Sequence, residues 1–245
     1  IENCAGDTSI ALSMISDDSF YMEMKKDYAP EMVTAFIRLN GATVGCVANR
    51  SEVYTDGEKT ATYDAALTAA GCEKAAAFVN FCNAFEIPVL TLVNVDGYKN
   101  CKCNEKKIAK AAARLTYAFA NADVPKVTVV VGKANGTAGL TMNSKSIGSD
   151  IVYAWKNAKI GVMEAAPAVK IMYADEIAKA DNAAALINEK AAQYNEMQAS
   201  ALAAAKRGYV DDIIEASETR QRVVAAFEML FTKREDRPSK KHGTI

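Results

Sequence analysis

The 245-residue sequence lacks features that several classes of protein require. Its one histidine, His242, lies in a polar tail, so a hydrolase with a Ser-His-Asp triad is not expected. The 29 Lys and Arg residues balance 30 Asp and Glu, which argues against nucleic acid or an anionic membrane as the main partner. No apolar run approaches the 18 or so residues that span a bilayer. These absences favour a soluble globular protein.

The sequence has six cysteines. The start lacks a basic region followed by an apolar core, so an export signal is not expected. Several of the six cysteines lie in apolar periodic stretches, where a free thiol behaves as a small hydrophobe. We therefore expect free thiols in a reducing cytoplasm. Cys101-Lys102-Cys103 could suggest a metal site, but the sequence offers no second pair at zinc-ribbon spacing. No metal is expected.

The most informative stretch runs from Lys126 to Met142. Residues 127–131 are a β-branched run typical of a strand buried on both faces. Three glycines in the eight residues 132–139 then predict a tight loop, and the small residues that follow predict a helix start. Amides at such a start lack intrahelical partners and can bind an oxyanion. Glycine-bearing turns of this kind are common in α/β proteins, so the pattern alone does not establish a function.

Helices and strands alternate through the middle of the chain. The apolar pattern predicts helices over 69–85 and 106–121, each followed by a buried strand, at 89–93 and 127–131. This alternation predicts an α/β fold in which the two strands are parallel neighbours and the helices pack outside them.

The flanking regions give further predictions. Asn40-Gly41 predicts a hairpin turn between strands at 32–39 and 43–48. Residues 1–18 are expected to be a linker or a frayed start, and 49–63 to be irregular. The alanine-rich stretch 183–207 predicts a helix with a possible break near Asn195, ended by Gly208.

Longer runs of sequence carry a resemblance to a known family. The runs are FIRLNGATVGCVANR (36–50), VNFCNAFEIPVLTLVNVDGY (79–98), VPKVTVVVGKANGTAG (124–139), SDIVYAWKNAKIGVM (149–163) and AAAKRGYVDDIIEASETRQRVVAAFEML (203–230). Together they resemble the C-terminal half of the biotin-dependent acyl-CoA carboxyltransferases, such as propionyl-CoA carboxylase β-chains and glutaconyl- or methylmalonyl-CoA decarboxylases. The resemblance implies a crotonase-like fold, the β-β-α superhelix of crotonase and Clp protease, with flanking helices. It also implies that residues 19–245 form the biotin-facing domain and that an N-terminal CoA-binding half is absent from this sequence.

The same resemblance implies a reaction and a set of partners. Family members move CO₂ between biotin, carried on a partner protein or domain, and an acyl-CoA. They commonly assemble as dimers up to hexamers, with no nucleic acid and no membrane insertion. In this chain the backbone amides of Thr137 and Ala138, after Gly136, would hold the biotin oxyanion. Gly97, Tyr98 and Leu140 would line the biotin pocket.

The chain also departs from the family pattern near the expected site. Thr137 replaces a glycine, and Asp96 replaces the proline of a Pro-Gly-Phe loop. Glu164 and Pro167 occupy positions usually held by glycine, and a buried unpaired Glu164 would be costly. These departures leave an alternative open, in which the chain is a degenerate half that serves as an assembly scaffold.

Overall fold

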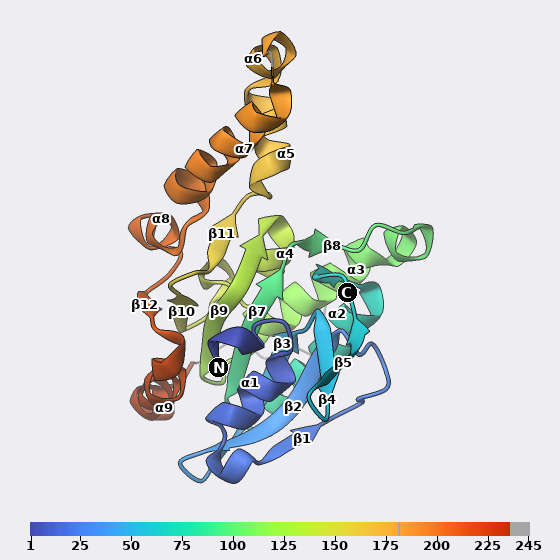
Figure 1. The fold of residues 1–245 in the computed structure, drawn as a ribbon. Helices are drawn as coiled ribbons and strands as arrows, with labels where there is room; N and C mark the ends of the chain where they lie inside the picture. The colour runs from blue at the N-terminus through green and yellow to red at the C-terminus, as the bar shows by residue number, and fades with distance from the viewer. Residues whose placement is uncertain (181, 236–245) are drawn as a thin grey trace.

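An eight-stranded sheet runs through the middle of the protein (Figure 1). The computed structural model describes residues 1–180 and 182–235. The strand order is β1-β2-β3-β7-β9-β10-β12, and β11 pairs with the far end of β9. The pairs β1–β2 and β2–β3 are antiparallel, whereas β3, β7, β9, β10 and β12 run parallel. The strands are β1 (Tyr21–Glu23), β2 (Met32–Leu39), β3 (Ala42–Asn49), β7 (Val89–Val95), β9 (Lys126–Asn135), β10 (Ile151–Trp155), β11 (Lys159–Gly161) and β12 (Asp212–Ile214).

The hairpin between β2 and β3 turns where the sequence predicts it. Asn40 and Gly41 have φ of 49° and 80°, the positive values that a type I′ turn needs at both central positions. Leu39 pairs with Ala42 directly across the turn. The hairpin prediction is confirmed.

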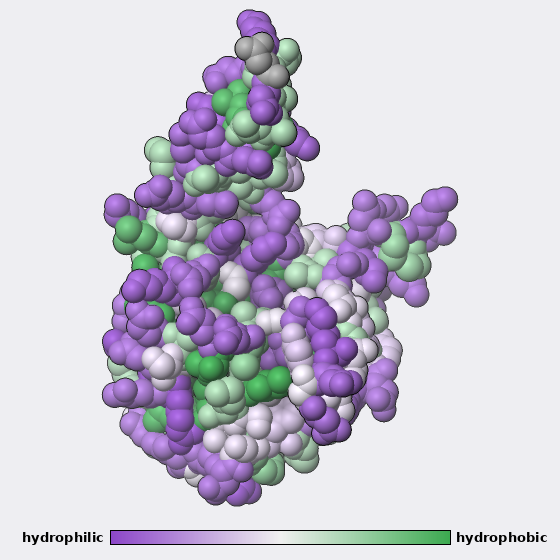
Figure 2. Space-filling model, viewed as in Figure 1, coloured by the Kyte–Doolittle hydropathy of each residue, from purple (hydrophilic) through white to green (hydrophobic). Residues whose placement is uncertain are grey.

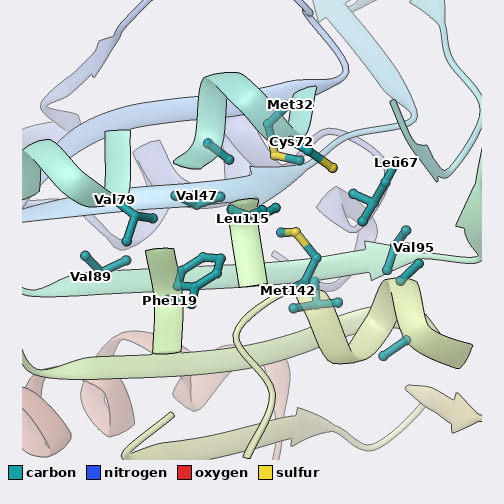
Figure 3. Packing of buried hydrophobic residues seen from close by; sticks show 14 of the residues in the cluster. Met32, Val47, Leu67, Cys72, Val79, Val89, Val95, Leu115, Phe119 and Met142 are labelled. Atoms are coloured by element: carbon teal, nitrogen blue, oxygen red, sulfur yellow. The ribbon is translucent and has the colours of Figure 1, made fainter. Parts of the chain in front are cut away.

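Helices α2 (Ala69–Ala84) and α3 (Lys102–Asn121) cover one face of the sheet. β7 and β9 are parallel neighbours, with Leu90 opposite Val127, as predicted from the helix–strand alternation. Figure 3 shows Val79 of α2 and Leu115 and Phe119 of α3 packing over these strands. Alternate strand residues face this core because side chains in a strand point to opposite faces in turn.

The other face of the sheet is covered by α1 (Thr8–Ile15) and α9 (Thr219–Met229). The expectation that residues 1–18 form a linker or frayed start is therefore wrong. Asp7 caps α1 by accepting from the amide of Ser9, and Leu12 and Ile15 are buried against the sheet. The helix is only eight residues long, too short for its apolar face to stand out from the polar residues around it.

Two small sheets lie outside the main one. β4 (Glu52–Thr55) and β5 (Glu58–Thr62) form an antiparallel hairpin, so the prediction of an irregular 49–63 segment is also wrong. The hairpin is polar and mostly exposed, and it therefore lacks the apolar alternation that marks a half-buried strand. β6 (Ala66–Leu67) pairs in parallel with β8 (Gly97–Tyr98).

A helical arm projects from the end of β11 (Figure 1). It contains α5 (Ala165–Met172), α6 (Ala174–Lys179) and α7 (Ala183–Tyr194). A π-helical turn at Asn195–Ala199 separates α7 from α8 (Ala201–Lys206), so the predicted break near Asn195 is confirmed. Gly208 has φ of 77°, as expected for a residue that ends a helix. None of the helices in the described residues is long and apolar enough to cross a membrane.

Lys74 of α2 is an unusual buried cation. Its side chain is 2% exposed, and its ammonium donates to the carbonyl oxygens of Met32 (2.6 Å) and Ala29 (3.3 Å). Burial lowers the pKa of Lys74 from 10.5 to about 8. Charging this residue in the folded protein therefore opposes folding at neutral pH.

This pKa predicts that Lys74 contributes more to stability at alkaline pH. Between pH 8 and 10.5 the unfolded chain binds a proton at Lys74 that the folded chain has released, so the contribution of this residue to the free energy of unfolding should rise with pH. We expect a rise of up to about 3 kcal/mol from this group. In Lys74→Met that rise should be missing, as measured by urea unfolding across the same window, while the surface control Lys110→Met keeps it. Parallel pH profiles for Lys74→Met and the parent would contradict this assignment.

Candidate functional site

β9 runs directly into the short helix α4 (Gly136–Thr141) at one edge of the sheet. The predicted tight loop over 132–139 is wrong, because β9 continues to Asn135, where it pairs with β11, and α4 begins at the next residue. The turn is concentrated at Gly136, whose φ is 57°. A Cβ at this position would lie 3.0 Å from the carbonyl oxygen of Val162, so a side chain here meets both backbone strain and a close neighbour.

A second glycine sets how closely α4 packs on the strand. A Cβ on Gly139 would lie 2.8 Å from the carbonyl carbon of Ala134, which is backbone and cannot rotate aside. Gly139 therefore lets α4 lie directly on the end of β9. The remaining glycine of this stretch, Gly132, serves a different contact, since a Cβ there would meet the Asn94 amide oxygen at 2.5 Å.

The first turn of α4 carries the two predicted oxyanion donors. Thr137 and Ala138 are the second and third residues of the helix, so their amides have no acceptor within it. Thr137 is exposed, whereas Ala138 is buried at 1% exposure.

A cavity of about 470 Å³ lies beside α4. Of the predicted site residues, Gly136, Thr137 and Leu140 line it. The other walls are mostly apolar, from Val93, Val130, Val152, Ile160 and Val162. Polar groups are contributed by Ser144, Lys145, Tyr194, Gln198, Arg207 and Tyr209.

Two polar features of this cavity matter for binding. The hydroxyl oxygen of Ser144 is buried and has no hydrogen-bond partner among the described residues. Lys145 is held in place by Asp211 at 2.8 Å, and Arg207 donates to the Gln198 carbonyl oxygen at 2.8 Å. The cavity therefore combines an apolar interior, one unsatisfied hydroxyl and tethered cations at its lining.

Gly97 and Tyr98 do not line this cavity. They form β8, which contacts α4, and the Tyr98 hydroxyl lies 3.2 Å from the Thr141 hydroxyl. Thr116 of α3 donates to the same Thr141 oxygen at 3.3 Å. Leu140 and Tyr98 therefore lie on different sides of the site. Leu140 belongs to α4 and lines the cavity, whereas Tyr98 of β8 contacts α4 through Thr141.

A charged network joins the elements around α4. The Lys133 ammonium contacts Asp96 and Glu164, each at 2.7 Å. Asp96 also accepts from the Asn135 side chain at 2.9 Å, and Asn135 is the residue that precedes α4. The network therefore connects the end of β9, the residue before β8 and the residue before α5.

The network explains departures that the sequence left unresolved. Although partial burial lowers the pKa of Lys133, its hydrogen bonds and charge interactions with Asp96 and Glu164 raise it overall. The Glu164 side chain is half exposed and paired, so it carries no burial penalty. Pro167 lies in the first turn of α5, where its missing amide hydrogen removes no helical hydrogen bond. Sequence reasoning singled out Asp96 and Glu164 but missed Lys133, whose only signal was its position at the end of the strand.

None of the six cysteines lines the cavity. All six cysteines are free thiols, and Cys46, Cys72 and Cys82 are buried. Within residues 1–180 and 182–235, no group of three or more His, Cys, Asp or Glu side chains is placed to hold a metal ion. His242 lies outside the described residues.

Comparison with known proteins decides the family. Residues 2–245 match the carboxyl transferase domain. The chain belongs to the carboxyl transferase domain family. It is 40% identical over 240 residues to the methylmalonyl-CoA carboxyltransferase 12S subunit of Propionibacterium freudenreichii subsp. shermanii, covering 98% of this chain and 44% of that protein. It is also 40% identical over 241 residues to the methylmalonyl-CoA decarboxylase subunit alpha of Propionigenium modestum, covering 96% and 44%.

Solved structures of carboxyl transferases have the same fold. The transcarboxylase 12S crystal structure with methylmalonyl-coenzyme A and methylmalonic acid bound is 40% identical, with a TM-score of 0.88 over 97% of this chain and 44% of that one. The predicted crotonase-like α/β fold is thereby confirmed, as is the resemblance to the C-terminal half of the family. This carboxyl transferase chain spans less than half the length of the relatives that it matches.

Proposed function

We propose that this chain is the biotin-facing half of a biotin-dependent acyl-CoA carboxyltransferase. It would move CO₂ between biotin and the α-carbon of an acyl-CoA. The observation that carries the proposal is the family match over residues 2–245, in which the first turn of α4 borders the cavity. A CoA-binding half, on the same polypeptide or on a partner, would complete the active site.

The chemistry requires donors for a developing oxyanion rather than a nucleophilic side chain. Biotin would supply a carboxyl carrier whose urea oxygen gains negative charge when the carboxyl group leaves. We assign the amides of Thr137 and Ala138 to that oxygen, because both belong to the first turn of α4 and lack helical acceptors. Such donors are effective only while the backbone holds them fixed, and Gly136 and Gly139 allow α4 to lie close against its neighbours.

The cavity supports binding of an apolar ligand with a few polar atoms. Leu140 and the valine-rich walls would contact the apolar part, and the Ser144 hydroxyl offers an unused hydrogen-bonding group. Tyr98 and Gly97 would act from the β8 side of α4, where Tyr98 meets Thr141. Tyr98 and Gly97 therefore remain in the proposed biotin site through contact with α4 rather than as walls of the cavity.

The proposal extends to partners and compartment. We expect a biotin carrier protein or domain, an acyl-CoA substrate and assembly with copies of this chain, from a dimer up to a hexamer. Apolar side chains exposed on the arm support such assembly, namely Ile171 and Met172. The free thiols support a reducing, cytoplasmic location.

The alternative function is an assembly scaffold without biotin chemistry. Thr137, Glu164 and Pro167 favour it on sequence grounds. Two of them fit the structure without cost, because Glu164 is paired with Lys133 and Pro167 lies in the first turn of α5. The two functions are separated by reassembling the chain with a CoA-binding half and measuring carboxyl transfer from carboxylated biotin. A working half requires intact α4 amides for this transfer, whereas a scaffold does not.

The Lys133 network gives a further test of the catalytic proposal. In Lys133→Met the carboxylates of Asp96 and Glu164 lose their shared partner, so the elements on both sides of α4 lose a common tether. We expect carboxyl transfer to fall about fivefold, the effect of about 1 kcal/mol from partly exposed ion pairs, with Lys133→Arg recovering part of it. The control Lys156→Met removes an exposed pair with Glu215 away from α4 and should leave transfer unchanged. Equal rates for Lys133→Met and Lys156→Met would exclude a role for the network in catalysis.

A further inference from the structure

Two thiols meet at the start of α3, outside the proposed carboxyl transfer site. The sulfur atoms of Cys101 and Cys103 are 2.8 Å apart. Cys103 is exposed and Cys101 is half-buried. The start of α3 stands out from the body as a largely hydrophilic projection (Figure 2). Solutes therefore reach this pair, unlike the buried thiols.

The surroundings give the two thiols different reactivity. The neighbouring Cys103 thiol, first-turn backbone amides and Lys99 lower the pKa of Cys101. The same contact with Cys101 raises the pKa of Cys103. Burial, by contrast, raises the pKa of Cys72 and Cys82 to about 12, which leaves those thiols unreactive.

The backbone also suits a bond between the pair. A separation of two residues keeps the Cα atoms within about 7 Å, close to the range that disulfides need. Cys101 precedes α3 with an extended backbone, φ −153° and ψ 150°, so closing the bond involves only the first turn. Exposed lysines at positions 99, 102 and 106 would attract an anionic reagent to this site.

We infer that Cys101 and Cys103 form a redox-active dithiol that exchanges with small-molecule disulfides of the glutathione type. The Cys101 thiolate attacks one sulfur of the disulfide, forming a mixed disulfide and releasing one glutathione thiolate. Cys103 then loses its proton and attacks the Cys101 sulfur, releasing the second glutathione thiolate. The protein dithiol is oxidised by two electrons, and one glutathione disulfide is reduced to two glutathiones.

Oxidation would act on the contacts at the start of α3. The Cys101 carbonyl oxygen accepts from the amides of Asn104 (2.9 Å) and Glu105 (3.0 Å). Asn104 in turn accepts from the Ala69 amide at 2.7 Å and donates to the Lys99 carbonyl oxygen at 2.8 Å. Oxidation therefore acts where α3, α2 and the segment after β8 are joined.

Mass spectrometry of the folded protein in glutathione redox buffers tests the inference. As the share of oxidised glutathione rises, the peptide containing residues 101 and 103 should lose two hydrogens in mass with nothing added. Cys103→Ser should instead accumulate one bound glutathione at Cys101, because no second thiol is present to release it. Cys4→Ser should behave as the parent does.

Alkylation rates provide the second measurement. With a limiting amount of iodoacetamide, Cys101 should be modified before Cys4, and Cys101→Ser should lose this fast phase. Two results would overturn the inference: a parent peptide that stays reduced, or one that holds glutathione without losing two hydrogens. Cys101→Ser and Cys103→Ser alter half-buried or exposed side chains at the start of α3, so loss of folding is not expected to obscure the result.

Discussion

Replacing Ala138 by proline should lower carboxyl transfer from carboxylated biotin about a hundredfold in a protein reassembled with its CoA-binding half. The substitution deletes one of the two amides that we assign to the oxyanion, and losing such a donor typically costs about 3 kcal/mol. Proline is tolerated in the first turn of a helix because the lost amide has no helical acceptor there. The measurement is the rate of labelled carboxyl transfer, with thermal unfolding as a check on folding.

Because Ala138 is buried, a second variant separates the lost amide from the added ring. Lactic acid in place of Ala138 converts the amide to an ester of nearly the same shape, and it should reduce transfer by a similar factor. Thr137→Gly keeps both amides and relaxes the backbone, so its rate should equal or exceed that of the parent. If both the proline and the ester proteins fold and transfer at the parent rate, the assignment of residues 136–138 is wrong and the scaffold function is favoured.

Replacing Glu23 by glutamine should destabilise the fold by about 3–5 kcal/mol, a large share of the roughly 5–15 kcal/mol that holds a typical domain together. Glu23 of β1 and Arg50 after β3 form an ion pair at 3.1 Å, with side chains only 6% and 4% exposed. The neutral amide leaves the Arg50 cation buried without a counter-charge. Urea unfolding at neutral pH gives the difference in free energy.

Two controls define the source of that effect. Glu215→Gln removes the same charge from an exposed pair with Lys156 and should change the free energy of unfolding by less than about 1 kcal/mol. A double variant, Glu23→Gln with Arg50→Met, removes both buried charges and should be more stable than Glu23→Gln alone. A cost for Glu23→Gln no larger than that for Glu215→Gln would show that the buried pair contributes little.

The departures from the family pattern are connected in space. Asp96 and Glu164 are 68 residues apart in sequence, yet both contact the Lys133 ammonium. We interpret them as parts of one alternative arrangement rather than as independent losses. This interpretation supports a working half, because the network joins segments next to α4 and leaves the cavity beside it in place.

The sequence alone determined the central architecture of this protein. The apolar runs at 89–93 and 127–131 and the apolar stripes of the helices that precede them require burial on both faces of a parallel sheet, and β7 and β9 are neighbours as predicted. The Asn40-Gly41 turn was equally determined, because few other residues adopt positive φ at both positions. Local constraints of this kind are contained in a few adjacent residues.

Only the tertiary structure decided the details of the site. The continuation of β9 to Asn135 depends on pairing with β11, which lies more than twenty residues further along the chain. The position of Tyr98 outside the cavity depends on its contact with Thr141. Both are long-range contacts, and nothing in the adjacent residues specifies them. The same reason applies to α1, whose burial depends on a sheet face that the first 18 residues do not contain.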